Sequence, residues 1–272
     1  MAKTFFMKNS SRVQMMGIVI ITDKGNTIVI DGGMEEDHEH LYELISKEGN
    51  GRVKAWFFTH LHCDHTGAFC KLCSVNPKLE VENIYYHFPS LQDHDKYGSK
   101  SDRDKRIRTE TVSLINNRFG NAAHVMQERE KYVFDDLTFT VLRVYNPTIK
   151  ANLENNSSAV IRIDGKKSNI LILGDLGVEG GDDTLSKCTF EDLHTEYTQL
   201  AHHGQQAVKR DFYEFIRPVR CLWFAPDWLW DNDEGNGFNT GPYETVMTRE
   251  WMKDLGVTKH IISKDGTTVF EI

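Results

Sequence analysis

His60-Leu61-His62-Cys63-Asp64-His65 comes directly after the apolar run Val53-Lys54-Ala55-Trp56-Phe57-Phe58. Such a short apolar run predicts a buried strand. Three imidazoles and one carboxylate then fall within six residues, where the chain leaves that strand. Neutral imidazole and carboxylate together suit zinc or another divalent first-row metal. The stretch therefore predicts a metal site at a strand end, against the alternative of a solvated loop that is rich in histidine.

Three other strand-like runs end in side chains of the same kinds. The runs and their following residues are 26–30 with Asp31-Gly32-Gly33, 168–173 with Gly174-Asp175, and 197–201 with His202-His203-Gly204. Sheets of α/β proteins usually place their sites at the carboxyl ends of strands. We therefore expect these polar residues to meet at one edge of the fold.

The order Asp31, His60-x-His62-x-Asp64-His65, Asp175, His203 resembles the metallo-β-lactamase superfamily over roughly residues 12–272. The second half is most similar to the soluble domain of the ComEC/Rec2 competence proteins. That similarity is carried by Asn155-Asn156-Ser157-Ser158-Ala159-Val160, by residues 171–176 and by residues 201–204. The resemblance implies an α/β fold, a four-layer αββα sandwich, and a metal-dependent hydrolase. It does not identify the substrate.

The candidate ligands divide between two ions. His60 and His62 are two apart in extended backbone, so their side chains share one face and can reach one ion. Asp64 and His65 lie at the turn into a helix and point to a second position, which His203 also reaches. Asp175 has two carboxylate oxygens and can bridge both ions. The predicted metal ligands are His60, His62, Asp64, His65, Asp175 and His203.

The predicted cofactor is zinc, as one or two divalent ions, with manganese or iron as alternatives. Two ions about 3.5–4 Å apart would supply a nucleophile from water at neutral pH without a separate strong base. The resemblance implies that Asp64, besides binding metal, accepts or shuttles a proton. Asp64 is therefore the predicted catalytic residue.

Two residues are predicted to support the ligands. Asp31 would accept a hydrogen bond from a ligating histidine, as such histidines usually require, although Asp-Gly-Gly is also ordinary turn sequence. Adjacent residues of an extended segment point to opposite sides, so His202 and His203 are not both expected at one ion. His203, directly before Gly204, is the favoured ligand. His202 would then pack behind it or reach the rim of the substrate pocket.

One family feature is missing. The superfamily usually has a further histidine ligand for the first ion between the His-x-His motif and the bridging aspartate, where this chain has Asn155-Asn156-Ser157-Ser158. Water or an Asn156 oxygen could complete that site, and His87 could line it. We therefore expect the first ion to bind more weakly than the second. His94 and His124 are predicted to be surface residues.

Composition limits the remaining classes. The 272 residues and the scarcity of proline predict one domain, residues 1–272. The net charge of −8 does not favour nucleic acid as a partner. Residues 96–108 nevertheless contain several basic side chains, which indicate either a solvated helix or a phosphate-binding lid. No run suits a membrane span. Five cysteines, an odd number, predict reduced, packed thiols and a cytoplasmic setting.

Hydrophobic periodicity predicts alternating strands and helices along the whole chain. The expected helices are 35–47, 65–75, 99–119, 207–216 and 242–255. The expected strands are 12–22, 26–30, 53–59, 81–86, 137–145, 157–163, 168–173, 197–201, 219–224, 257–262 and 267–272. The aromatic residues 223–230 indicate core packing with a loop cover, or an apolar wall of a substrate pocket.

These observations favour a metal-dependent hydrolase that acts on an ester-type bond in a small molecule. A phosphodiester or another phosphorylated substrate is the first choice, and a thioester or lactone is the alternative. A non-catalytic metal-binding domain of the same fold is a second class. A redox di-iron protein is a third, which His62 disfavours because that branch typically has glutamate there. The oligomeric state is not determined by the sequence.

Overall fold

The computed structural model describes all 272 residues and contains two seven-stranded sheets. In spatial order, the first sheet consists of β14 (Thr268–Glu271), β1 (Lys3–Phe6), β2 (Gly17–Ile21), β3 (Thr27–Asp31), β4 (Ala55–Phe57), β5 (Ile84–Tyr86) and β6 (Ala123–Val125). The second consists of β13 (Lys259–Ile262), β12 (Arg220–Trp223), β11 (Tyr197–Gln199), β10 (Asn169–Ile172), β9 (Val160–Asp164), β8 (Leu137–Arg143) and β7 (Lys131–Phe134).

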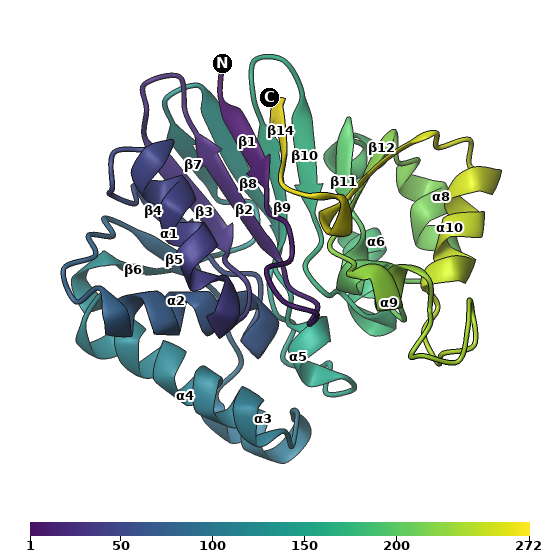
Figure 1. Ribbon diagram of the computed structural model, residues 1–272, viewed down its shortest axis with the longest axis horizontal. Coiled ribbons are helices and arrows are strands. Elements are labelled where there is room, and N and C mark those ends of the chain that lie inside the picture. The colour runs from purple at the N-terminus through teal and green to yellow at the C-terminus, as the bar shows by residue number, and fades with distance from the viewer.

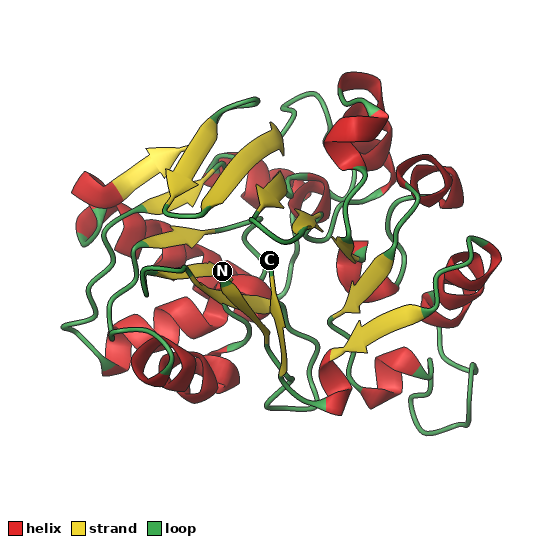
Figure 2. Cartoon of the chain, turned by 90° about the horizontal axis from the view of Figure 1, so that it is seen from above, coloured by secondary structure: helices red, strands yellow, loops and turns green.

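Helices cover the outer faces of both sheets. They are α1 (His38–Lys47), α2 (Cys63–Val75), α3 (Leu91–Tyr97), α4 (Asp102–Asn117), α5 (Leu153–Asn156), α6 (Val178–Lys187), α7 (Phe190–Leu193), α8 (Arg210–Ile216), α9 (Asp227–Trp230) and α10 (Thr245–Asp254). Helices α1, α2 and α4 lie on one side of the sheets, and α6, α8 and α10 on the other (Figures 1 and 2). The predicted fold class, α/β with two sheets between helical layers, is confirmed. None of the helices combines the length and apolar character that crossing a membrane requires.

Aromatic side chains join the two sheets. Phe57 of β4 stacks on Phe139 of β8, with ring centroids 4.6 Å apart. Tyr197 of β11 stacks on Phe270 of β14 at 4.2 Å. Trp56, next to Phe57, points to the other face and meets Phe69 of α2 edge-on at 5.0 Å. Because successive side chains of a strand point to opposite faces, β4 contributes to the core between the sheets and to the core beneath the helices.

The helices bury narrow apolar stripes. In α1 these are Leu41, Leu44 and Ile45, at the spacing of one helical face. On α4, Arg103 and Arg106 form ion pairs with Glu36 and Glu35 in the short 3-10 helix before α1, Nη2 of Arg103 lying 2.6 Å from Glu36 Oε2. The basic residues of α4 that face solvent therefore belong to a mixed-charge solvated helix. Cys70 and Cys73 are unpaired and buried, as the sequence predicts.

Several elements differ from the sequence-based expectations. The short strands β1, β6 and β7 and the helices α3, α5, α6, α7 and α9 were not predicted from periodicity. The two closing strands belong to different sheets: β13 pairs with β12, whereas β14 pairs with β1, so the two ends of the chain lie close together (Figure 1). Strands β1, β6 and β7 have only three or four residues each. A strand this short shows no periodic pattern that can be recognised in the sequence.

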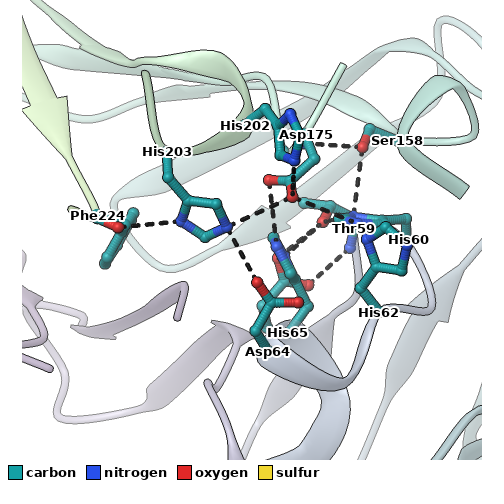
Figure 3. Close-up of polar contacts among 12 residues, drawn as sticks. Thr59, His60, His62, Asp64, His65, Ser158, Asp175, His202, His203 and Phe224 are labelled. Carbon is teal, nitrogen blue, oxygen red and sulfur yellow. Dashed lines mark hydrogen bonds and ion pairs between the residues drawn. The ribbon is translucent and has the colours of Figure 1, made fainter. Parts of the chain in front are cut away.

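Parallel pairing gathers the polar strand ends. In the first sheet β3 and β4 run parallel, and in the second β10 and β11 run parallel. The residues that follow these strands therefore lie at the carboxyl end of each pair. Both ends meet at the same edge of the sandwich, which is where the sequence places its polar residues (Figure 3).

Candidate metal centre

Six side chains from both sheets converge at this edge (Figure 3). His60 and His62 lie in the loop after β4, while Asp64 and His65 lie in the first turn of α2. Asp175 follows β10, and His203 lies in a short turn after β11. The turn before Asp175 requires glycine, because Gly174 has φ +55° and a Cβ there would come within 2.8 Å of Ser158 Oγ. The first sheet thus supplies four residues of the cluster and the second sheet supplies two.

Asp64, His65, Asp175 and His203 form the more deeply buried group. Their potential ligand atoms all lie within 4.8 Å of one another. His65 Nε2 lies 3.2 Å from Asp175 Oδ1, and His203 Nε2 lies 3.1 Å from Asp64 Oδ2 and 3.4 Å from Asp175 Oδ2. Two imidazole nitrogens and two carboxylates at such distances form a set that one divalent ion can bind.

His60, His62 and Asp175 form the second group. His60 Nε2 lies 3.0 Å from His62 Nδ1 and 3.7 Å from Asp175 Oδ2. The opposite nitrogen of His60, Nδ1, lies 3.1 Å from Thr59 Oγ1 and 3.3 Å from Ser158 Oγ. Asp175 Oδ2 lies near both His60 and His203, and Oδ1 lies near His65, so the carboxylate lies between the two positions.

Asp31 contacts Nδ1 of His65, the ring nitrogen on the side away from Asp175. Its Oδ2 accepts a hydrogen bond from His65 Nδ1 at 2.7 Å, and its two oxygens accept from the backbone N–H and the hydroxyl of Thr59 at 2.8 and 2.7 Å. A carboxylate on Nδ1 fixes the tautomer, so the lone pair of a neutral His65 lies on Nε2, which faces Asp175. Asp31 holds an uncommon left-handed backbone, with φ 54°, to make these contacts.

The charges within the cluster shift one another's ionisation. Burial favours the neutral carboxyl of Asp175, but His65 and His203 outweigh it and hold the pKa of Asp175 well below its usual range. Burial likewise opposes the charged form of His203, but Asp175 and Asp64 raise its pKa to about 9. For Asp31, the effect of burial exceeds that of the hydrogen bonds from His65 and Thr59, so the pKa of its carboxyl group is raised. The carboxylates therefore draw positive charge into the cluster.

Buried atoms without partners show what the cluster lacks. His65 Nε2, both oxygens of Asp175 and the nearby Asn155 Oδ1 are buried and have no hydrogen-bond partner. Buried polar groups are nearly always satisfied in native structures. Carboxylate oxygens and a ring nitrogen whose lone pair points inwards are all electron-pair donors. One or two divalent cations bound among them would satisfy these atoms, so the residues present fit the predicted metal.

The cluster borders one cavity, and a larger hollow shares Trp228 with that cavity. A cavity of about 300 Å³ is lined by Gln14, His62, Asp64, His202 and Trp228. Trp228 also borders a larger hollow of about 860 Å³, which contains Arg12, Lys264, Tyr243 and several acidic residues. Trp228 is fixed there, because its Nε1 donates to the Arg12 carbonyl at 2.6 Å. The loop after β12 therefore contributes to the pocket wall as well as to the core.

Two candidate contacts predicted from the sequence lie elsewhere. The amide of Asn156 donates to the Ala151 carbonyl and to Glu179, both at 2.8 Å, and its oxygen accepts from Gly180 N–H at 2.8 Å. Asn156 therefore ties α5 to α6, and the prediction that its oxygen completes the first site is wrong. His87 has its Nδ1 2.7 Å from the Met126 carbonyl and does not line the cavity beside His62.

The prediction about the two adjacent histidines also needs correction. Residues 201–204 form a short turn rather than an extended segment, and His202 and His203 both have left-handed backbones with φ 50° and 59°. Both rings consequently turn towards Asp175, with His202 Nε2 3.9 Å from Asp175 Oδ2. The expectation of opposite directions was wrong because it assumed a strand.

Sequence reasoning missed a second buried group next to the centre. His94, predicted at the surface, is fully buried and lies against Glu154, with 3.1 Å between Nδ1 and Oε1. His124 is exposed, as predicted.

Asn155, rather than Asn156, points towards the centre, with Nδ2 3.5 Å from His202 Nε2. The pair of asparagines was visible in the sequence, but only the register of α5 decides which one faces the ligands.

The chain is similar to a known protein family and to solved structures of the same fold. Residues 18–202 match the model of the metallo-beta-lactamase superfamily. The structure is similar to the metallo-beta-lactamase fold protein YhfI from Bacillus subtilis, with 11% identity, 100% of both chains covered and a TM-score of 0.56. A diphosphatase of the PhnP family shares 11% identity over 82% of this chain and 85% of its own, with a TM-score of 0.46. The subclass B3 metallo-beta-lactamase MEM-A1, from a soil metagenome library, shares 16% identity over 64% and 61%, with a TM-score of 0.40.

The family match covers more than half of the chain, and the aligned fold of YhfI spans all of it. This chain therefore belongs to the metallo-beta-lactamase superfamily. The curated proteins give no match. The similarity to the solved structures is too distant in sequence to indicate more than the fold.

Proposed function

We propose that this protein is a metal-dependent hydrolase that cleaves an ester-type bond, with a phosphodiester or another small phosphorylated molecule as substrate. The observation that carries the proposal is the group of buried, unpartnered electron-pair donors around Asp175. In a structural network these atoms would have hydrogen-bond partners, as the oxygens of Asp31 have in Thr59 and His65. Their arrangement beside an open cavity suits ions that also contact a substrate.

Asp175, Asp31 and Asp64 each have a defined task in this proposal. Zinc or a similar ion, when bound, lowers the pKa of water from 15.7 to about 7 and polarises the bond under attack. The carboxylate of Asp175 can contact both positions, since Oδ2 lies near His60 and Oδ1 near His65, and Asp31 fixes the ring of His65. Asp64 lines the cavity and accepts a hydrogen bond from Gln14 Nε2 at 3.3 Å. We assign to Asp64 the acceptance of a proton from the attacking water.

Pocket size and charge favour a small substrate over a nucleic acid. The cavity beside the ligands and the larger hollow next to it, about 300 and 860 Å³, suit a small organic molecule. Arg12 and Lys264 in the larger hollow can contact an anionic group. Four acidic residues in the same hollow repel a polyanion, and the chain carries a net charge of −8. These residues are Asp227, Asp231, Asp233 and Glu234.

A thioester or lactone is the second candidate substrate. Val13, Met34 and Trp228 give the cavity beside the ligands an apolar side that an acyl chain could contact. The proposed similarity to ComEC/Rec2 proteins, through Asn155-Asn156 and residues 201–204, favours the phosphodiester instead. The two substrate classes differ in charge, so one panel of assays can separate them.

The test starts from the purified, zinc-loaded protein. Its turnover of bis(p-nitrophenyl) phosphate, p-nitrophenyl phosphate, a short acyl thioester and a single-stranded oligonucleotide is compared with that of Asp175→Asn. We expect hydrolysis of the small phosphodiester that chelation and the substitution both abolish. Hydrolysis of the thioester alone would replace the substrate class. Bound metal without hydrolysis of any of the four would identify a non-catalytic metal-binding domain.

A further inference from the structure

The first metal position is short of ligands, and the turn after β11 faces it. His60, His62 and Asp175 supply only three donor side chains. The segment where the superfamily has a further histidine, Asn155 to Ser158, contains no histidine. His202 is not among the expected ligands, yet its Nε2 is 3.9 Å from Asp175 Oδ2 (Figure 3).

The backbone of this turn holds both histidine rings towards Asp175. His202 has φ 50° and ψ 48°, and His203 has φ 59° and ψ 13°, a conformation that residues with a Cβ rarely adopt. The turn is fixed by a hydrogen bond from His202 N–H to the Gly174 carbonyl at 3.0 Å. Gly204, with φ +86°, continues it, and a Cβ there would come within 2.3 Å of the Trp223 ring. Unusual backbone of this kind is concentrated at functional sites.

Hydrogen bonding determines which nitrogen of His202 is free. Its Nδ1 lies 2.5 Å from the Gln206 carbonyl oxygen. A carbonyl oxygen only accepts, so Nδ1 carries the hydrogen and the lone pair of the neutral ring lies on Nε2. His203 has the same arrangement, with Nδ1 3.0 Å from the Phe224 carbonyl and Nε2 3.4 Å from Asp175 Oδ2. Metal-ligating histidines in general bind through one nitrogen and donate the other N–H to such a partner.

The surroundings of His202 Nε2 are rich in electron pairs. The Asn155 amide approaches it with Nδ2 at 3.5 Å, which is at the limit of a hydrogen bond. The other amide atom, Asn155 Oδ1, is buried without a partner, as are both oxygens of Asp175. A substrate phosphate would need an N–H from His202, but the free nitrogen offers a lone pair. A cation suits this environment better than an anion does.

We infer that His202 supplies the third nitrogen ligand of the first ion, which is then bound by His60, His62, His202 and Asp175. The inference rests on the proposed metal centre and replaces the role at the substrate rim that the sequence suggested. Three imidazoles and one carboxylate would then hold the first ion, and zinc can add a fifth ligand for water or substrate. The first ion is then held by as many protein ligands as the second, and the protein binds two ions rather than one tight and one weak.

The experiment measures metal directly, without reference to turnover. Metal-free protein is loaded with zinc, passed through chelator-treated gel filtration and analysed for zinc per chain. We expect about two ions in the unsubstituted protein and about one in His202→Ala. Competition with a chromophoric chelator should show a loss of affinity at one site greater than the about 10–100-fold that is typical of an outer partner of a ligand. His124→Ala, which removes an exposed histidine bonded to Asn83, is the matched control and should retain two.

Further variants guard against loss of fold and separate the possible failures. His202→Asn introduces a residue that tolerates the left-handed turn but has a shorter side chain. It should lose the same ion, while its metal-free form should unfold at the same temperature as the metal-free unsubstituted protein. In cobalt-loaded protein, the visible absorption bands should change in both His202 variants. Two ions held by His202→Ala with unchanged affinity, even with an altered KM, would overturn the inference and leave the hydrolase proposal intact. A single ion in the unsubstituted protein would also overturn it, whereas no bound metal at all would remove the metal centre itself.

Discussion

Two buried polar clusters lie side by side in this protein and are built on different principles. The metal centre consists of His60, His62, Asp64, His65, Asp175 and His203. The second, which we call the Glu154 cluster, consists of Glu154 of α5, His94 of α3, Arg108 of α4 and the backbone of Ser99. All the side chains of the Glu154 cluster are at least nine-tenths buried. Both clusters join segments that are distant in sequence, and both contain histidine and carboxylate.

The clusters differ in how their charges are compensated. Glu154 Oε1 accepts from Ser99 N–H at 2.8 Å and from Arg108 Nη1 at 3.1 Å, and lies 3.1 Å from His94 Nδ1. Arg108 brings a permanent positive charge into that cluster. The metal centre contains no arginine or lysine, and both oxygens of Asp175 remain without a hydrogen-bond partner. A surplus of electron-pair donors, rather than burial or histidine content, therefore distinguishes a ligand site from a structural network.

The most severe test of this distinction is Asp175→Asn. The substitution keeps the shape of the side chain but removes the charge and one oxygen between the two metal positions. We expect loss of both ions and of all measurable hydrolysis, with a native circular dichroism spectrum. Zinc analysis and turnover are the measurements. Full activity in this variant would remove the hydrolase proposal altogether.

In the Glu154 cluster the corresponding test is Arg108→Met. Removing one partner of a buried pair leaves an uncompensated charge and typically costs about 3–5 kcal/mol of unfolding free energy. We expect a loss of that size in urea unfolding, with zinc binding unchanged while the variant is folded. Arg103→Met, on the same helix but paired with Glu36 at the surface, should cost at most about 1 kcal/mol. Loss of zinc from folded Arg108→Met would mean that the clusters are not separate.

Asp31→Ala tests the support behind the metal centre. Asp31 bonds Nδ1 of His65 but does not face Asp175, so its loss should reduce metal affinity or activity by about 10–100-fold rather than abolish it. Asp37→Ala is a suitable control. Asp37 is also buried, but its oxygens accept from the backbone N–H groups of Ser10 and Met34 and touch no histidine of the centre. A loss as complete as that of Asp175→Asn would indicate that Asp31 binds metal directly.

Acid should weaken the Glu154 cluster gradually. Burial raises the pKa of Glu154, but His94 and then His62 outweigh it, so the folded pKa lies below the ordinary value of 4.5. A carboxyl group with a lowered folded pKa stabilises the fold fully above its unfolded pKa, and this contribution is lost as the pH falls through the folded value. The stability lost between pH 7 and acid should therefore be smaller in Glu154→Gln, measured as unfolding free energy by urea titration. An unchanged pH slope would show that Glu154 is not ionised in the fold.

The strand ends were predictable because each combines an apolar run with polar residues that are unfavourable in an apolar core. That reasoning placed Asp31, His60, Asp175 and His203 at one edge, and the structure brings them together around His65 and Asp175. It failed for His94, because the partner that makes its burial tolerable, Glu154, is 60 residues away in the chain. It also failed for the direction of His202, since the left-handed turn depends on a contact between distant segments, the hydrogen bond from His202 N–H to the Gly174 carbonyl.

The four-residue helix α5 shows the same limit. A helix this short has no apolar period, so the sequence could not indicate whether Asn155 or Asn156 faces the ligands. The narrower likeness to ComEC/Rec2 proteins remains a prediction, as does the assignment of the individual ligands. Zinc analysis of the variants tests the ligand assignment. The panel of substrates tests the activity that the likeness to ComEC/Rec2 proteins implies.

The metal centre takes ligands from both sheets, with His60, His62, Asp64 and His65 on one side and Asp175 and His203 on the other. Bound ions would therefore fasten the two halves of the sandwich at that edge, in the manner of a cross-link that can be removed. An ion that binds only the folded state stabilises it by about 4.1 kcal/mol when its free concentration is 1,000 times its Kd. Chelation should accordingly lower the unfolding temperature, and amide hydrogen exchange should accelerate first in the loops after β4 and β10, while the aromatic contacts between the sheets remain protected.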